Sequence, residues 1–595
     1  MQISTSTRPI LHFFFLLFLT TQLLFSQKEN TKYLDSISKT IIEENSLPGT
    51  HEWELTNPAI QREIEGYASA TSVNVGDSIN LFINTSASKY TISFYRAGWY
   101  NGLGGRLITG SFTMDGIVQE IPKPDSKTGI VECNWTHPFS LKIEENWTSG
   151  VYLAKLQENT SNTQSYIIFV VRNDAKPTDI LFQLPVTTYQ SYNVWGGKSL
   201  YDHASGDSLP WGSSEGQEAD KVSFDRPYAR STNIKAAKGM GAGEFFTNVQ
   251  PINEGYPISS SSWDYSMVRW LEKNGYDVSY NTNIDTHTSP NALKKHTLFL
   301  SQGHDEYWTK EMRDNVISAR DTGINLAFFG ANIAYWQMRL EPSSITKKPN
   351  RTMVCYKNAN ADPVDDILTT IKFRDPPISE PEATLIGVQY FTDRVDTDMI
   401  ISNASHLIFK GTGLKNGDKL KGLLGYEVDG VTKNSPSNIQ TLTSSKAFYL
   451  KPADLSYRAV IKTLLIKTNF FLAVLISFVL LALVFYLLKY IKKRRGFSSN
   501  RLTTITMIVF IFTAIGALVV LNDFQNKNKT NMTIYTAESG AKVFSTGTIQ
   551  WSWGLDDYNV PQLRTSRYDK NAEIITHNVL ELLGAKNSNL TRTKK

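Results

Sequence analysis

The feature that most constrains the fold is an alternation of short apolar segments with amphipathic ones between residues 179 and 330. Two segments have the apolar spacing of a helix: 262–274, which Gly275 ends, and a segment that begins at Thr309 and ends near Gly323. Four short apolar segments have the length of buried strands, namely DILFQLP, YDVSY, HTLFLSQ and INLAFFG. Strands that alternate with helices predict a parallel sheet with helices on both faces.

The chain before this region has the pattern of an all-β domain. Between Gly66 and Arg172, short runs rich in β-branched and aromatic residues are separated by Gly, Asn, Asp and Ser, as in SINLFINT, GVYLAKLQ and SYIIFVVR. Several such strands in about 105 residues predict a β-sandwich. We therefore expect a sandwich domain at 62–173, after a linker at 27–61, and an α/β domain at 174–460.

Length and composition place the chain among exported multidomain proteins. At 595 residues it is too long for a single core. Residues 1–26 have the charged start (Arg8) and apolar middle of a signal peptide. The net charge of +5 is small, and no basic tract with interleaved aromatics indicates a nucleic-acid partner. The two cysteines, Cys133 and Cys355, fall in different predicted domains, so we expect two separate buried thiols.

Two apolar segments near the C-terminus predict a transmembrane hairpin. Residues 469–488 and 502–521 are uncharged and long enough to cross a bilayer as helices. The loop at 489–501 is strongly basic, which places it in the cytoplasm. We therefore expect a multi-pass membrane protein with both main soluble parts on the exported side, in which 530–586 completes the α/β domain.

Polar residues follow several of the predicted strands directly. Residues 303–306 (GHDE) follow one strand, 330–332 (GAN) follow the next, and 189–193 (YQSYN) follow the first. Open α/β sheets bind their ligands beyond the carboxyl ends of the strands. The sequence therefore predicts that these three segments meet at one crevice.

Several common catalytic patterns are missing. There is no H-E-x-x-H helix, no C-x-x-C pair and no G-x-S-x-G turn, which disfavours zinc proteases, structural zinc sites and serine hydrolases. The glycine-rich segment at 238–244 follows no clear strand, so we interpret it as a loop that lines the cleft rather than a phosphate cradle.

Six motifs, in this order, resemble the large (beta) subunit of N,N-dimethylformamidase. They are YQSYNVWGGKSLY, VSFDRPYAR, GHDEYW, GANIAYWQMR, GLLGYEVDG and GTIQWSWGLDDY. The resemblance covers roughly 62–460 and 533–585. It implies a β-sandwich followed by a glutamine-amidotransferase-like α/β domain with a parallel sheet, here interrupted by the two-helix hairpin.

The same resemblance implies a mononuclear iron (Fe³⁺) held by two tyrosines and one glutamate. Carried onto this sequence, Glu306 would be the carboxylate, Tyr228 one phenolate and Tyr192 the other, with Tyr189 as the alternative to Tyr192. Phenolate and carboxylate oxygens are hard donors, which suit a trivalent cation.

Three further residues take their roles from the resemblance. His304 and Asn332 would orient water or substrate, and Glu427 would be the general base. The expected function is an exported, membrane-anchored, metal-dependent hydrolase of amide C–N bonds, acting on a small amide, with homo-oligomerisation left open. The alternative is a non-catalytic envelope protein whose β-sandwich binds glycan or polymer.

Overall fold

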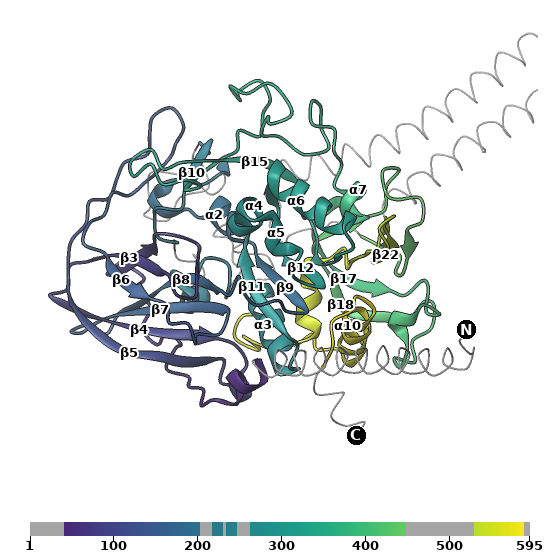
Figure 1. Ribbon diagram of the computed structural model, residues 1–595, viewed down its shortest axis with the longest axis horizontal. Coiled ribbons are helices and arrows are strands. Elements are labelled where there is room, and N and C mark those ends of the chain that lie inside the picture. Colours follow the sequence, from purple (N-terminus) through teal and green to yellow (C-terminus); the bar gives the residue numbers. More distant parts are fainter. Residues whose placement is uncertain (1–40, 203–216, 230–233, 247–261, 448–528, 588–595) are drawn as a thin grey trace, which may run out of the picture.

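The computed structural model describes residues 41–202, 217–229, 234–246, 262–447 and 529–587. Two sheets come first in the chain and enclose one apolar core (Figure 1). In β3 the side chains alternate, so that Ile79, Leu81 and Ile83 are buried and their neighbours are more exposed. The sheet orders are β1-β3-β6 and β2-β8-β7-β4-β5, with bounds β1 Ile64–Ala68, β2 Ser72–Asn74, β3 Ser78–Thr85, β4 Lys89–Ala97, β5 Gly105–Asp115, β6 Phe139–Lys142, β7 Gly150–Glu158 and β8 Gln164–Arg172.

A seven-stranded sheet forms the centre of the second part of the molecule. Its order is β11-β9-β12-β14-β23-β22-β19, and the first five of these strands run parallel. The strands are β9 Ile180–Leu184, β11 Val278–Thr282, β12 Leu298–Gly303, β14 Asn325–Gly330, β19 Gln440–Thr441, β22 Thr533–Thr536 and β23 Lys542–Ser545. β9, β11 and β12 are buried at every position, and β14 at every position after Asn325, because both faces of a parallel sheet are covered.

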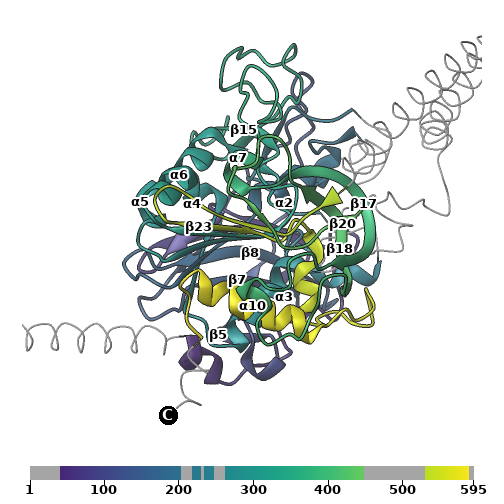
Figure 2. The same ribbon diagram turned by 90° about the vertical axis from the view of Figure 1, so that its right-hand side faces the viewer.

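Helices cover both faces of this sheet. Figure 2 shows α4, α5 and α6 on one face and α3 and α10 on the other. Their bounds are α3 Trp263–Lys273, α4 Asn283–Thr288, α5 Pro290–Leu293, α6 Lys310–Asp321 and α10 Lys570–Leu582. The predicted start of α6 is confirmed, since the Thr309 hydroxyl accepts a hydrogen bond from the Met312 amide at 3.0 Å.

The smaller elements surround the end of the sheet where the polar segments lie. A four-stranded sheet has the order β10-β16-β15-β13, with β10 Lys221–Ser223, β13 Tyr307–Thr309, β15 Trp336–Glu341 and β16 Thr352–Val354. A long antiparallel ribbon joins β17 Gln389–Ile400 to β18 Lys419–Gly430. The remaining elements are α2 Val186–Tyr192, α7 Ala383–Ile386, β20 Ser445–Lys446, β21 Lys529–Thr530 and the 3-10 helices η1 Tyr100–Gly102, η2 Trp195–Gly197, η4 Ile234–Gly239, η5 Leu407–Phe409 and η6 Ile549–Gly554.

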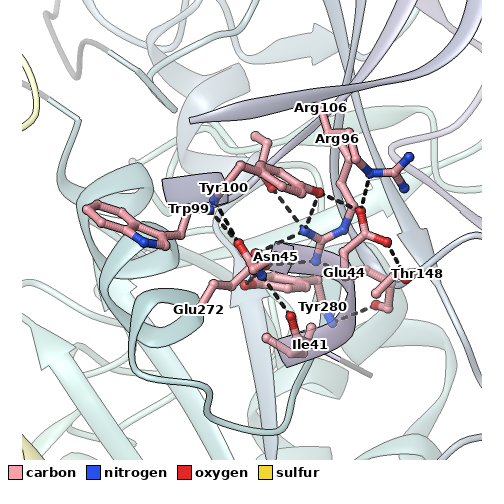
Figure 3. A network of polar contacts seen from close by, with 12 residues as sticks. Ile41, Glu44, Asn45, Arg96, Trp99, Tyr100, Arg106, Thr148, Glu272 and Tyr280 are labelled. Atoms are coloured by element: carbon pink, nitrogen blue, oxygen red, sulfur yellow. Dashed lines mark hydrogen bonds and ion pairs between the residues drawn. The ribbon is translucent and has the colours of Figure 1, made fainter. Parts of the chain in front are cut away.

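A buried polar network joins the two parts of the molecule (Figure 3). Arg96 on β4 forms two hydrogen bonds to Glu272 on α3, at 2.7 and 2.9 Å, and neither side chain is exposed. Tyr280 also donates to Glu272, at 2.9 Å, and Arg96 donates to the Ser149 carbonyl at 2.8 Å. The ion pair and its additional hydrogen bonds link β4 of the sandwich to α3 and β11 of the second part. The two cysteines are free and buried, as predicted.

The predicted transmembrane hairpin requires a correction. Across the described ranges, no helix is long and apolar enough to cross a membrane. This finding conflicts with the fold class that included a two-helix hairpin, with the membrane as a partner and with a multi-pass localisation, so these predictions are withdrawn. The two predicted spans themselves, 469–488 and 502–521, and the signal peptide at 1–26 lie outside the described residues.

Candidate functional site

Three polar segments meet at the carboxyl ends of the central strands. β12 ends at Gly303, β14 ends at Gly330, and β9 leads through Pro185 into α2. Gly303 has a φ of +68°, and a Cβ built on it would lie 2.8 Å from a carboxylate oxygen of Asp264. Only glycine fits this position without strain, because of both the backbone conformation and the close neighbour.

The centre of the site is a histidine between two glutamates. His304 Nε2 lies 3.3 Å from Glu306 Oε2 and 3.3 Å from Glu427 Oε2, and all three side chains are buried. Glu427 comes from β18 of the long ribbon, far from the other two in sequence. Burial by itself lowers the pKa of His304, but the charges of Glu427 and Glu306 outweigh it and hold that pKa well above its ordinary value. The two carboxylates therefore favour the protonated form of the imidazole.

Two tyrosines hydrogen-bond to Glu306. Tyr192, the last residue of α2, donates to Glu306 Oε2 at 2.9 Å. The Tyr201 hydroxyl lies 3.0 Å from each of the two carboxylate oxygens. The two rings stack at 4.4 Å between centroids, with 18° between their planes. The backbone amide of Glu306 donates to Thr188 Oγ1 at 2.9 Å, so α2 also fixes its main chain.

Asp305 has a different role from its two neighbours. Its carboxylate accepts hydrogen bonds from Gln183 at 2.7 Å, Ser301 at 2.8 Å and Asn283 at 2.9 Å. Gln183 lies on β9, Ser301 lies on β12, and Asn283 begins α4 directly after β11. A buried carboxylate with this many donors holds strand ends together. Among the three ionisable residues of the GHDE segment, Asp305 therefore stabilises the fold.

The second predicted tyrosine, Tyr228, lies among residues of the sandwich and of α2. Within the described part of the chain, Tyr228 makes no hydrogen bond to Glu306 or Tyr192, and it lines small cavities between the sandwich and α2, beside Gly66 and Gly241. Tyr189, the alternative, donates to Asp264 at 2.6 Å. The set of Tyr192, Tyr228 and Glu306 as ligands of one metal ion therefore stays a prediction.

The predicted metal site requires a correction too. In the ranges that the structure covers, no group of three or more His, Cys, Asp or Glu side chains is placed to hold a metal ion. This finding conflicts with the description of the chain as a metal-binding protein. Two of the three predicted iron ligands, Tyr192 and Tyr228, belong to none of these four residue types, so the predicted ligand set itself stays a prediction. No contact among the described residues tests which cofactor the protein binds, so Fe³⁺ stays a prediction from the sequence.

Asn332 lies at the end of the neighbouring strand. Its backbone amide donates to Asp429 Oδ1 at 2.9 Å, and its φ of +54° is a left-handed conformation that asparagine tolerates. Its side-chain oxygen is buried and accepts no hydrogen bond from the described residues. The role of Asn332 toward a substrate stays a prediction.

Sequence reasoning missed two residues of the site, Tyr201 and Lys357. Tyr201 is the last residue of the YQSYNVWGGKSLY motif, so its membership of that motif was the available signal. The Lys357 ammonium lies 3.4 Å from the centre of the Tyr201 ring. No periodicity or motif indicates Lys357, which reaches the site from the loop after β16.

A mixed α/β fold of several sheets carries this site. The chain belongs to the N,N-dimethylformamidase beta subunit-like family, whose C-terminal region matches residues 91–566. The suspected family is thereby confirmed.

Other comparisons add no functional argument. No curated protein matches the chain. An alkylpurine DNA glycosylase from Pseudomonas fluorescens, bound to DNA with an abasic site analog, has a TM-score of 0.12 and 12% identity, over 18% of this chain and 30% of that chain. A family 123 glycoside hydrolase from Clostridium perfringens has a TM-score of 0.10 and 10% identity, over 48% of this chain and 74% of that chain. Similarity this low carries no conclusion about fold or function.

Proposed function

We propose that this chain hydrolyses amide C–N bonds at the cluster of His304, Glu306 and Glu427. The observation that carries the proposal is the position of His304, 3.3 Å from each of two buried carboxylates at the carboxyl end of a parallel sheet. The family to which the chain belongs is named for an enzyme that acts on an amide, which supports the same reaction class.

The three side chains divide the proton transfers of the reaction between them. Glu427 takes a proton from the water that attacks the amide carbon, and the His304 imidazolium donates a proton to the leaving nitrogen as the C–N bond breaks. The products are a carboxylic acid and an amine. The proton on Glu427 then returns to His304, across the 3.3 Å that separates them, which restores the starting state.

Glu306 acts on His304 rather than on the substrate in this scheme. Its Oε2 lies 3.3 Å from His304 Nε2, on the same nitrogen that faces Glu427. A second carboxylate keeps the imidazole charged and oriented while Glu427 changes its protonation state. The predicted iron enters no step of this scheme.

The test compares two histidine variants of the full chain. His304→Asn should lower the rate of amide hydrolysis by at least about 100-fold, the usual contribution of a positioned acid or base. His296→Asn is the matched control, because His296 is buried at the opposite, amino-terminal edge of the sheet, beside Thr178. The assay measures amine released from N,N-dimethylformamide and from a series of larger N-acyl amines, with the iron content measured on the same samples.

The outcome decides between the two functional classes. Equal rates for His304→Asn and the wild type would contradict the proposed site. A well-folded wild type that releases no amine from any of these amides would reject the reaction, and binding of a glycan by the same sample would favour the alternative function.

A further inference from the structure

Tyr201 contacts Tyr192 and Glu306 of the site and the half-buried Lys357. One face of its ring stacks on Tyr192 at 4.4 Å, and the Lys357 ammonium lies 3.4 Å from its centroid. Its hydroxyl lies 3.0 Å from both oxygens of Glu306. The ring and the hydroxyl are therefore each fixed by separate contacts.

The placement of Lys357 is costly, which indicates that the fold enforces it. Lys357 has a φ of +58°, a conformation that lysine rarely adopts, and its amide is held by the Thr370 carbonyl at 2.8 Å. Its ammonium donates to the Leu200 carbonyl, next to Tyr201 in the chain. An ammonium in a half-buried residue needs such compensation, and the face of an aromatic ring supplies part of it.

The hydrogen-bond directions assign the Tyr201 proton to Glu306. Tyr307 donates its own hydroxyl proton to the Tyr201 oxygen at 2.6 Å. Since that oxygen already accepts a hydrogen bond, the Tyr201 proton is available for the carboxylate. Tyr192 and His304 both contact Oε2 of Glu306, so Tyr201 is the hydroxyl that also reaches Oε1.

We propose that Tyr201 is a positioning residue that sets the orientation of the Glu306 carboxylate toward His304, and that Lys357 holds Tyr201 in place for this role. The catalytic consequence rests on the proposed amide hydrolysis, whereas the orientation of Glu306 does not. Tyr201→Phe keeps the ring between Tyr192 and Lys357 but removes the hydrogen bond to Oε1 that the described residues supply, so the carboxylate turns about its last side-chain bond.

The test combines structures with kinetics on the full chain. Crystal structures of the wild type and of two variants should show the effect. In Tyr201→Phe, Glu306 should be turned away from His304. In Lys357→Met, the Tyr201 ring and Glu306 should each occupy more than one orientation. With N,N-dimethylformamide as the probe, kcat of Tyr201→Phe should fall by about 10- to 100-fold, as expected for a lost hydrogen bond to a charged group, with little change in KM. Tyr152→Phe is the control, because Tyr152 is buried in the sandwich and donates to the Thr148 carbonyl at 2.7 Å.

Two results would overturn the inference. One is an unmoved Glu306 carboxylate in Tyr201→Phe, or in Lys357→Met if Tyr201→Phe does not fold. The other is a fall in kcat for Tyr152→Phe as large as that for Tyr201→Phe. If the wild type releases no amine while Glu306 turns in Tyr201→Phe, the positioning role stands and the proposed function fails.

Discussion

Asp277 illustrates how one residue can reduce the stability of the fold at high pH. It precedes β11 at the edge of the sheet opposite the site, is 5% exposed, and accepts a hydrogen bond from the Asp179 amide at 3.3 Å. Burial, and secondly the charge of Asp179, raise the pKa of Asp277 to about 7. The unfolded chain would have a value of about 3.9. A carboxyl group with a raised pKa favours folding most at low pH, and this contribution is lost as the pH rises through the folded-state value.

Asp277→Asn should therefore stabilise the protein at pH 8 and have little effect at pH 4. The amide keeps the acceptor for Asp179 but carries no charge. The gain is at most about 4 kcal/mol, since each pKa unit corresponds to about 1.4 kcal/mol. Melting temperatures of variant and wild type across this pH range measure the effect. Asp115→Asn, at an 82% exposed side chain, is the control and should show no such trend. A constant difference between Asp277→Asn and the wild type at all pH values would contradict the argument.

At the scale of elements, the C-terminal strands complete the central sheet. β23 pairs in parallel with β14, where Leu326 faces Val543 and Phe328 faces Ser545. β22 then pairs with β23 in the antiparallel direction. Val543 and Phe544 have no exposed surface. If β23 were removed, β14 would lose its neighbouring strand and the apolar contacts that come with it. We therefore expect the folding of the α/β part to depend on the C-terminal segment that contains β22 and β23.

Phe544→Ala should destabilise the protein by about 3–5 kcal/mol, the usual cost of removing a buried phenylalanine side chain. Leu407→Ala, at a residue that is 66% exposed, should change stability by less than about 0.5 kcal/mol. Urea unfolding followed by tryptophan fluorescence measures both. A loss for Phe544→Ala no larger than that for Leu407→Ala would show that the tail folds independently of the sheet.

The whole molecule is held together at the junction between the sandwich and the α/β part. Figure 3 shows Arg96 and Glu272 at the centre of the network, with Tyr100 and Glu44 beside them. Tyr100 donates to Glu44 at 2.6 Å, so the segment before the sandwich also joins the junction. Removal of one member of a buried ion pair leaves the other charge without compensation, whereas removal of both is much less costly.

Glu272→Gln should therefore destabilise the protein by about 3–5 kcal/mol, while the double variant Arg96→Met/Glu272→Leu should lose less than the sum of its single variants. The exposed pair of Lys89 and Asp115 is the control, and Lys89→Ala should cost at most about 1 kcal/mol. Equilibrium unfolding of the wild type, Arg96→Met, Glu272→Leu and the double variant gives the coupling energy. Additive losses, or a Glu272→Gln variant as stable as the wild type, would show that the pair does not join the two parts.

The sequence by itself determined the local elements and the edge of the sheet where the polar residues lie. Helix α3 and the Thr309 start of α6 follow from side-chain spacing and capping, which depend only on neighbours in the chain. The position of GHDE beyond β12 follows from its place directly after an apolar strand. The site residues His304, Glu306, Glu427 and Tyr192 were named from motifs, and the structure brings these four side chains together.

Only the tertiary structure decided which side chains surround Glu306. Tyr201, 105 residues away in the sequence, hydrogen-bonds to it, whereas Tyr228 of the more conspicuous DRPY motif lines a cavity beside the sandwich. Asp305 lies between two site residues in the sequence, yet its partners on other strands make it a structural carboxylate. Such contacts join segments that are distant in the chain. They depend on the paths of loops and on packing between rings, and the spacing of residues along one segment carries no information about either.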